Sequence, residues 1–238
     1  MALPLYLAMT GAEMRSAAAM PEKAAWMACH FSPYSTGLSN FPTALPKGST
    51  IIVNDRTPPC GHDPALIAAQ LQQLAEDWEA DGVLLDFQRP GGEETAAIAK
   101  AVTDLLTCPV GVSEPYAEAL ACPVFLAPAP LHLPLSSHLD RWKGRILWLD
   151  AALDAAVITV DANGRRFMPL FPPETGKDGF EEIKLHCRYR IKPEKDCVQF
   201  TLWRTEECLH SLLRQAEALG VSRAFGLYQQ LGYKNPTD

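Results

Sequence analysis

Short apolar runs alternate with segments of helical periodicity along most of the chain. The clearest run lies within residues 81–88 (DGVLLDFQ), which open with a turn-forming Asp-Gly and close with polar side chains. An apolar run this short between turn signals predicts a strand that is buried on both faces. The spacing of apolar residues predicts one helix before it, over 64–80, and another after it, over 93–106. We interpret the rest of the chain as repeats of this helix–strand–helix unit.

Eight segments have the character of barrel strands, centred near residues 5, 27, 52, 85, 110, 125, 200 and 226. Strands alternating with helices in this number predict an α/β fold of the (β/α)8 TIM-like barrel type. The helices expected after strands 1, 5 and 6 are short, so the barrel would be pared down. A doubly wound open sheet is the alternative, but no GxGxxG motif follows any predicted strand.

The rhythm changes between residues 140 and 195. Residues 145–149 and 156–160 resemble strands, and the turn at Asn163-Gly164 predicts a hairpin that returns over 165–170. Residues 183–191 alternate apolar and polar side chains, which is typical of a half-exposed strand. We therefore predict one barrel domain over residues 1–238 that contains an antiparallel β insertion near 140–195.

Composition narrows the class of protein without identifying it. The apolar fraction of 47% and the charged fraction of 21% are ordinary for a soluble globular domain. A net charge of −7 and the lack of any basic run argue against nucleic acid or an anionic membrane as partners. Seven scattered cysteines without a CxxC spacing, and an N-terminus without a basic region, predict reduced thiols and a cytoplasmic location. Nothing indicates a metal or another cofactor, and the oligomeric state stays open.

Polar and aromatic residues follow the ends of several predicted strands, where barrel enzymes build their sites. Flat aromatic rings beside amides and carboxylates suit sugar rings, whose C–H faces pack on aromatic side chains. Each of these residues also has a structural alternative, such as a local ion pair or a place in the core. The candidates for substrate binding are His30, Tyr34, Asp55, Arg56, Gln88, Tyr116, Trp203 and Tyr228.

Two carboxylates are the candidates for catalysis. Asp86 ends the fourth predicted strand and Glu114 follows the fifth, so neighbouring strands would bring them to the same edge of the barrel. Paired carboxylates can divide into an acid and a base when their surroundings differ. The structural alternatives are a buried Asp86 paired with a neighbouring cation and a solvated Glu114 in a loop.

The fourth predicted strand resembles the signature of glycoside hydrolase family 18, the chitinase and chitinase-like family. That signature is Asp-Gly-apolar-Asp-apolar-Asp-aromatic-Glu on the fourth strand of a barrel. Six of the eight positions of Asp81 to Gln88 match it, with Leu84 in place of the middle Asp and Gln88 in place of the final Glu. The family's Met-x-Tyr-Asp feature on the sixth strand is missing from residues 124–128 (VFLAP).

The resemblance implies a TIM barrel and a site for amino sugars. In the family, the final Glu protonates the leaving oxygen while the substrate's acetamido oxygen attacks, and the last Asp, here Asp86, orients that group. Gln88 can donate hydrogen bonds, but its amide does not release a proton near neutral pH. The loss of a general acid removes roughly 10²- to 10⁴-fold in rate.

Three hypotheses follow from these observations. The first is a family 18-like barrel that binds an amino-sugar oligosaccharide with weak or absent hydrolysis. The second is an active hydrolase that uses relocated carboxylates, Asp86 with Glu114 or Asp55. The third is a non-catalytic scaffold that binds a partner protein and whose barrel mouth is filled by its own side chains. The sequence leaves open whether the protein is an enzyme.

Overall fold

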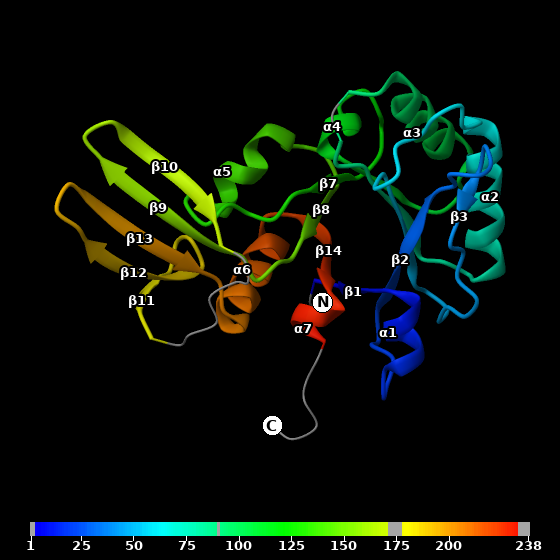
Figure 1. The fold of residues 1–238 in the computed structure, drawn as a ribbon. Coiled ribbons are helices and arrows are strands. Elements are labelled where there is room, and N and C mark those ends of the chain that lie inside the picture. Colours follow the sequence, from blue (N-terminus) through cyan, green and yellow to red (C-terminus); the bar gives the residue numbers. More distant parts are fainter. Residues whose placement is uncertain (1–2, 90, 171–177, 233–238) are drawn as a thin grey trace.

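Eight parallel strands form a closed barrel in the computed structural model, which describes residues 3–89, 91–170 and 178–232 (Figure 1). The strands are β1 (Leu5–Met9), β2 (Ala24–Phe31), β4 (Thr50–Asn54), β5 (Gly82–Asp86), β6 (Val110–Ser113), β7 (Val124–Leu126), β8 (Leu147–Asp150) and β14 (Val221–Leu227). Their order is β1-β14-β8-β7-β6-β5-β4-β2, and pairing of β1 with β2 closes the ring. The predicted barrel is thereby confirmed. The two-residue strand β3 (Leu38–Ser39) pairs antiparallel with β2.

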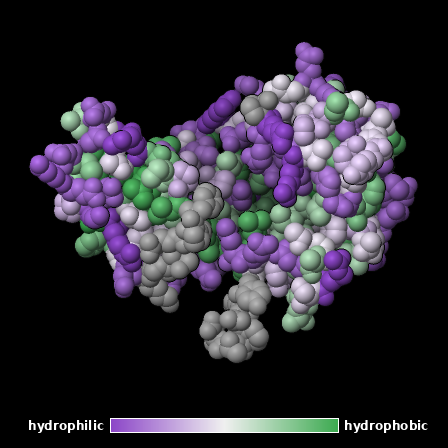
Figure 2. Space-filling model, in the orientation of Figure 1, coloured by the Kyte–Doolittle hydropathy of each residue, from purple (hydrophilic) through white to green (hydrophobic). Residues whose placement is uncertain are grey.

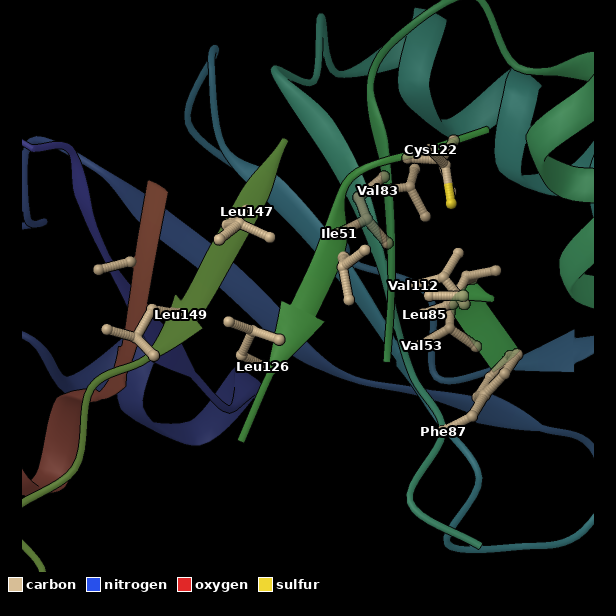
Figure 3. Close-up of a cluster of buried hydrophobic side chains, with 14 of the residues drawn as sticks. Ile51, Val53, Val83, Leu85, Phe87, Val112, Cys122, Leu126, Leu147 and Leu149 are labelled. Carbon is tan, nitrogen blue, oxygen red and sulfur yellow. The ribbon is translucent and has the colours of Figure 1, made fainter. Parts of the chain in front are cut away.

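Burial on both faces explains why the barrel strands are continuous apolar runs. Alternate side chains of a strand point to opposite faces. Val83 and Leu85 of β5 therefore join the cluster between the barrel and its outer helices, whereas Leu84 lies in the cluster inside the barrel. Figure 3 shows the outer cluster, in which Val83 and Leu85 are drawn with their counterparts from β4, β6, β7 and β8.

Two long helices, α2 (Pro64–Asp77) and α3 (Glu93–Leu105), cover the outside of the barrel near β4, β5 and β6 (Figure 1). Asp63 caps α2 by accepting from two backbone N–H groups, and Pro64 occupies the first helical position. The helices after the first, fifth and sixth barrel strands are short, as predicted: α1 (Gly11–Ser16), α4 (Glu114–Ala117) and α5 (Leu135–Leu139). A 3₁₀ turn (Asp140–Trp142), α6 (Glu206–Ala218) and α7 (Tyr228–Leu231) complete the helices of the described residues. None of these helices has the length and apolar character needed to cross a membrane.

The seventh barrel strand is β8, and the prediction of a barrel strand near residue 200 is wrong. β8 pairs in parallel with β7 and β14, although the sequence prediction assigned residues 145–149 to the insertion. Residues 197–203 instead form β13 (Cys197–Trp203), which pairs antiparallel with β9 (Ala155–Asp161). Both segments are apolar, but β8 is almost fully buried, whereas the first five residues of β13 are half-buried. Half-burial is typical of a sheet with one solvated face.

The antiparallel insertion consists of β9, β10 (Gly164–Pro169), β11 (Phe180–Glu182), β12 (Cys187–Pro193) and β13. These strands form one sheet in the order β10-β9-β13-β12-β11, which stands beside the barrel on the left of Figure 1. The predicted hairpin at Asn163-Gly164 is confirmed as the β9–β10 pair. The strand predicted over 183–191 is confirmed only from residue 187, where β12 begins, because residues 183–186 form a turn in which His186 has a positive φ of 48°. The sheet leaves the barrel at the carboxyl end of β8 and returns through α6.

The inside of the barrel is filled by large side chains at its middle. Trp148 of β8 and Phe225 of β14 pack there with Leu84 and Ile52. Gly111 of β6 makes room for the indole, because a Cβ at this position would lie 2.1 Å from a ring atom of Trp148. These side chains form a packed layer across the barrel. On the side of this layer where the strands have their carboxyl ends, the barrel is open.

The surface of the insertion shows how it joins the barrel. In the orientation of Figure 1, Figure 2 shows hydrophobic residues over the five-stranded sheet and in a recess between that sheet and the barrel, while hydrophilic residues cover the tips of its hairpins. The inner face of the sheet packs through Ala156, Cys187 and Leu202 on Leu131 of the loop after β7. The insertion is thus attached to the barrel by an apolar cluster of its own.

Candidate functional site

A cavity of about 930 Å³ lies at the carboxyl ends of the barrel strands. Its floor is apolar and includes Phe125 and Phe225 from the layer that fills the barrel. Polar groups surround this floor, and they come from strands β2, β4, β5 and β8 and from the loops that follow the strands. The polar and charged lining residues are Thr10, His30, Asn40, Asn54, Asp55, Arg56, Thr57, Asp86, Gln88, Arg89 and Asp150.

Asp86 and Gln88 both line the cavity, as the fourth-strand motif predicted. The amide Nε2 of Gln88 donates a hydrogen bond to Oδ1 of Asp86. A second possible donor to the same oxygen is the hydroxyl of Ser113 at the end of β6, at 3.4 Å. This hydroxyl lies closer, at 3.1 Å, to the carbonyl oxygen of Leu85. The glutamine that replaces the expected acid is therefore a partner of the aspartate.

A second carboxylate, Asp150, lines the same cavity from the end of β8. Sequence reasoning missed it, because it assigned this segment to the antiparallel insertion. A signal was present: residues 147–150 (LWLD) repeat the pattern of 83–86 (VLLD), an apolar run that ends in aspartate. The same strand geometry therefore places both carboxyl groups at the same level of the barrel mouth.

Both carboxyl groups favour the protonated form more than an exposed aspartate does. Burial raises the pKa of Asp86, and the negative charge of Asp55 adds to the rise, while the hydrogen bonds from Gln88 and Ser113 oppose it. Burial likewise raises the pKa of Asp150 to about 7, with further contributions from the negative charges of Asp86 and Asp154. The negative charge of Asp86 therefore disfavours ionisation of Asp150 in the same cavity.

Asp55 has a structural task although it lines the cavity. Its carboxylate is only 4% exposed and accepts hydrogen bonds from the backbone N–H groups of Gln88, at 3.1 Å, and of Arg89, at 2.8 Å. The structural alternative for Asp55, a local ion pair with the adjacent Arg56, is replaced by these two contacts with backbone N–H groups. The guanidinium of Arg89 donates instead to the carbonyl of Arg56 at 2.8 Å, so that the loops after β4 and β5 are joined.

Amide and imidazole groups complete the polar rim. His30 lines the cavity with Nδ1 at 3.0 Å from the carbonyl of Ala28. Asn54 donates to the carbonyls of Met27 and Cys29 at 3.2 and 3.1 Å. Asn40, from the loop after β3, also lines the cavity. These groups are already oriented by backbone contacts, which favours recognition of a polar ligand.

The structure contradicts several of the predicted site residues. Glu114 lies outside the cavity, because it accepts a hydrogen bond from Nε1 of Trp142 at 2.9 Å and is 3.4 Å from the backbone N of Ala127. The hydroxyl of Tyr116 donates a hydrogen bond to the carbonyl of Arg89, in the loop after β5, and Tyr116 does not line the cavity. The proposed Asp86–Glu114 carboxylate pair is therefore wrong.

The remaining three aromatic candidates also lie outside the cavity. Tyr34 is 96% exposed and extends into solvent. Tyr228 begins α7 directly after β14 and is not among the residues that line the cavity. Trp203 is fully buried in the five-stranded sheet, where the guanidinium of Arg190 lies 5.0 Å from its ring centre. It was misplaced because β13 was taken for a barrel strand. The aromatic rings that do reach the cavity, Phe125 and Phe225, come from strand interiors.

Among residues 3–89, 91–170 and 178–232, no three or more histidine, cysteine, aspartate or glutamate side chains are grouped in a way that could hold a metal ion.

Comparison by sequence finds no relatives, whereas comparison by structure does. No protein-family model and no curated protein matches the chain. A glycoside hydrolase family 18 chitinase from Cycas revoluta superposes with a TM-score of 0.57 at 12% identity, over 94% of each chain. The class V chitinase of Nicotiana tobaccum gives 0.55 at 11% identity, over 95% of this chain and 93% of that one.

A third similar structure is the spore cortex-lytic enzyme SleL of Bacillus megaterium QM B1551. Its TM-score is 0.54 at 9% identity, over 98% of this chain and 71% of that one. The two plant chitinases were each solved as a variant that includes a glutamate-to-glutamine change, in complex with an N-acetylglucosamine tetramer. At these identities the similarity establishes a shared fold: the chain has the barrel architecture of the family 18 chitinases.

Proposed function

We propose that the barrel mouth binds an oligosaccharide of the amino-sugar type. The observation that carries the proposal is the cavity of about 930 Å³ with an apolar, partly aromatic floor and a rim of amides and charged groups. Its volume is within the range of small-molecule sites, and it opens at the end of the barrel where such sites are built. This end of the molecule can bury a ring and still satisfy its hydroxyl groups.

The lining matches the two kinds of surface that an amino sugar presents. The C–H groups of the sugar ring and the methyl of an acetamido group pack on Phe125, Phe225 and Leu84. Hydroxyl and amide groups pair with Asn54, Gln88 and the other polar rim residues. The plant chitinases of the same fold support this choice of ligand, since each holds an N-acetylglucosamine tetramer although its chain carries a glutamate-to-glutamine change.

Hydrolysis by the usual family 18 route is not part of this proposal. Gln88 stands where the family has its proton donor, and it is engaged with Asp86. The partner-scaffold hypothesis predicted a mouth filled by side chains, and the open cavity argues against that prediction. The hypothesis of a hydrolase that pairs Asp86 with Glu114 or Asp55 loses its support, because both candidate partners are held by other groups.

Binding can be tested with chitotetraose and a variant that fills the cavity. Ala152 lines the cavity and is partly exposed, so Ala152→Trp places an indole in the ligand's volume. Ala18→Trp adds the same ring at an exposed position outside the cavity and serves as the matched control. We expect calorimetry to detect binding by the wild type and by Ala18→Trp, and at least a tenfold loss of affinity in Ala152→Trp. Equal affinity in all three proteins would place the ligand elsewhere and refute the proposal.

A further inference from the structure

We propose that Asp86 and Asp150 form an acid–base pair that hydrolyses a glycosidic bond in this site, with Asp150 as the proton donor and Asp86 as the base. The inference rests on the proposed function, because it requires a carbohydrate in the barrel mouth. It goes beyond that proposal because it assigns the two catalytic roles to residues on two different strands. One of them, Asp150, lies outside the fourth-strand motif.

Geometry provides the first support. Each aspartate is the last residue of its strand, β5 or β8, and each lines the cavity. The strands β6 and β7 lie between them in the barrel, and β7 contributes Phe125 to the cavity floor. A sugar ring that packs on Phe125 therefore has one carboxyl group on each side, as in glycosidases that use two carboxylates.

Hydrogen bonding separates the two roles. Asp86 accepts from the amide of Gln88, and a donor to a carboxylate favours its charged form. No side chain within the described residues donates to Asp150. The backbone N–H of Ala151 donates to the carbonyl of Phe225 at 2.6 Å and also interacts with the Asp150 carboxylate, which lowers the pKa of Asp150 by less than burial and the neighbouring charges raise it. The site therefore supports a charged Asp86 and a protonated Asp150 at the same time.

The surrounding charges agree with this division. The pKa of Asp150 is raised to about 7 by burial and by the negative charges of Asp86 and Asp154. Asp154 itself lies 3.9 Å from the guanidinium of Arg204, which partly offsets its charge. The other titratable or charged groups of the cavity lining are His30, Asp55, Arg56 and Arg89. A donor with a pKa near 7 is suited to acid catalysis near neutral pH.

The reaction step balances with water as the only co-reactant. Asp150 gives its proton to the glycosidic oxygen as the bond from that oxygen to the anomeric carbon breaks. Asp86 takes a proton from a water molecule whose oxygen forms the new bond to the anomeric carbon. The products are two shorter sugars, Asp150 is left charged, and Asp86 is left protonated. Passage of the proton from Asp86 to Asp150 through water restores the starting state.

The test measures binding and turnover of chitotetraose separately, by calorimetry and by chromatography of the products. We expect the wild type to hydrolyse it with a rate that falls as the pH rises through about 7, where Asp150 loses its proton. Asp150→Asn and Asp86→Asn are each expected to lower kcat by roughly 10²-fold or more while binding changes by only a few-fold. Asp104→Asn, a carboxylate-to-amide change on the exposed surface of α3, is the control and should keep full activity.

The outcomes are distinct for the two proposals. Binding of chitotetraose without turnover between pH 4 and pH 8 refutes the acid–base pair and leaves the carbohydrate site in place. Turnover that persists in Asp150→Asn, or that is lost in Glu114→Gln, also refutes the pair. Failure to bind refutes the proposed function and the pair together. The pH profile of the wild type needs no variant, so it decides the question even if an asparagine variant does not fold.

Discussion

Aspartates at the two ends of the barrel have pKa values shifted in opposite directions. At the amino end, Asp81 accepts hydrogen bonds from Tyr6, from Lys23 at 3.2 Å and from Arg223 at 2.8 Å. Although burial alone would raise the pKa of Asp81, these partners lower it below its usual value. At the carboxyl end, Asp86 is affected by the negative charge of Asp55 and Asp150 by that of Asp86, and both have raised pKa values.

The contrast separates stability from function within one motif. Asp81 and Asp86 are the two aspartates of the run DGVLLDFQ, at opposite ends of β5. The charge of Asp81 is balanced by Arg223 at the amino end of the barrel. The guanidinium of Arg223 also lies 4.8 Å from the ring centre of Trp148. The second aspartate, Asp86, has a raised pKa and lines a cavity, which is the combination typical of functional carboxylates. Removal of a charge should therefore destabilise one end and stabilise the other.

The largest effect on stability is expected from Asp81→Ala. The change leaves Lys23 and Arg223 without their carboxylate in a partly buried site, and Asp81 is 28% exposed, so the cost should be about 2–3 kcal/mol. For a chain of this length the melting temperature should fall by roughly 5–10 °C, which calorimetry can measure. A fall of less than 1 °C would mean that the amino-end network is not structural.

Asp150→Asn should have the opposite sign. Above pH 7 the wild type must hold a charged Asp150 in a buried site, and an amide of the same shape avoids this cost. Each pKa unit corresponds to about 1.4 kcal/mol, and solvent in the open cavity reduces the effect, so we expect a gain on the order of 2 kcal/mol at pH 8. Denaturant unfolding at pH 8 is the measurement. A loss of stability there would show that Asp150 has a partner that holds it charged.

The free energy of unfolding should depend on pH in opposite ways through Asp150 and Asp81. Asp150 has a folded pKa of about 7 against an ordinary value of 3.8, so the stability associated with it falls as the pH rises from about 4 to 7. Asp81 has a lowered folded pKa, so its contribution is present above about pH 4 and is lost as the pH falls below it. Melting temperatures of the wild type and of Asp150→Asn should converge near pH 4 and separate toward pH 8. Parallel curves would contradict the raised pKa.

The smallest effect is expected from Lys23→Met. The ammonium of Lys23 is 37% exposed and shares Asp81 with Arg223 and Tyr6, so its removal leaves the carboxylate paired. Such partly exposed ion pairs contribute about 0–1 kcal/mol. We expect a shift in melting temperature of no more than about 3 °C, well below that of Asp81→Ala. A larger shift would make Lys23, rather than Arg223, the main counter-ion.

Much of the barrel was predictable because its strands are buried on both faces. The strands predicted near residues 27 and 52 lie where the structure has β2 and β4, since continuous apolar residues between turns have few other arrangements. The start of α2 was predictable from Asp63 and Pro64, which are local signals. The fourth-strand motif correctly identified Asp86 and Gln88 as lining residues, because it fixes both the strand and the face.

The site was harder to predict where it depended on pairing between distant segments. Asp150 was missed and Trp203 was misplaced for the same reason: β8 and β13 are both short apolar runs, and their partners decide which belongs to the barrel. Glu114 has the expected position after β6, but its side chain turns to Trp142. Rotamers of this kind depend on neighbours that are 28 residues away in the chain.

The sequence by itself determined the alternation of strands and helices, the place of the Asp81–Gln88 motif within it and the replacement of the expected acid by Gln88. These are local properties, set by periodicity and by side-chain chemistry. Only the tertiary structure decided that β8 completes the barrel, that Asp150 faces the same cavity as Asp86, and that Asp81 is neutralised by Arg223 from the last strand. These contacts form when the barrel closes, because closure brings together strands that are far apart along the chain. The spacing of apolar residues within each strand does not indicate which distant strand it pairs with.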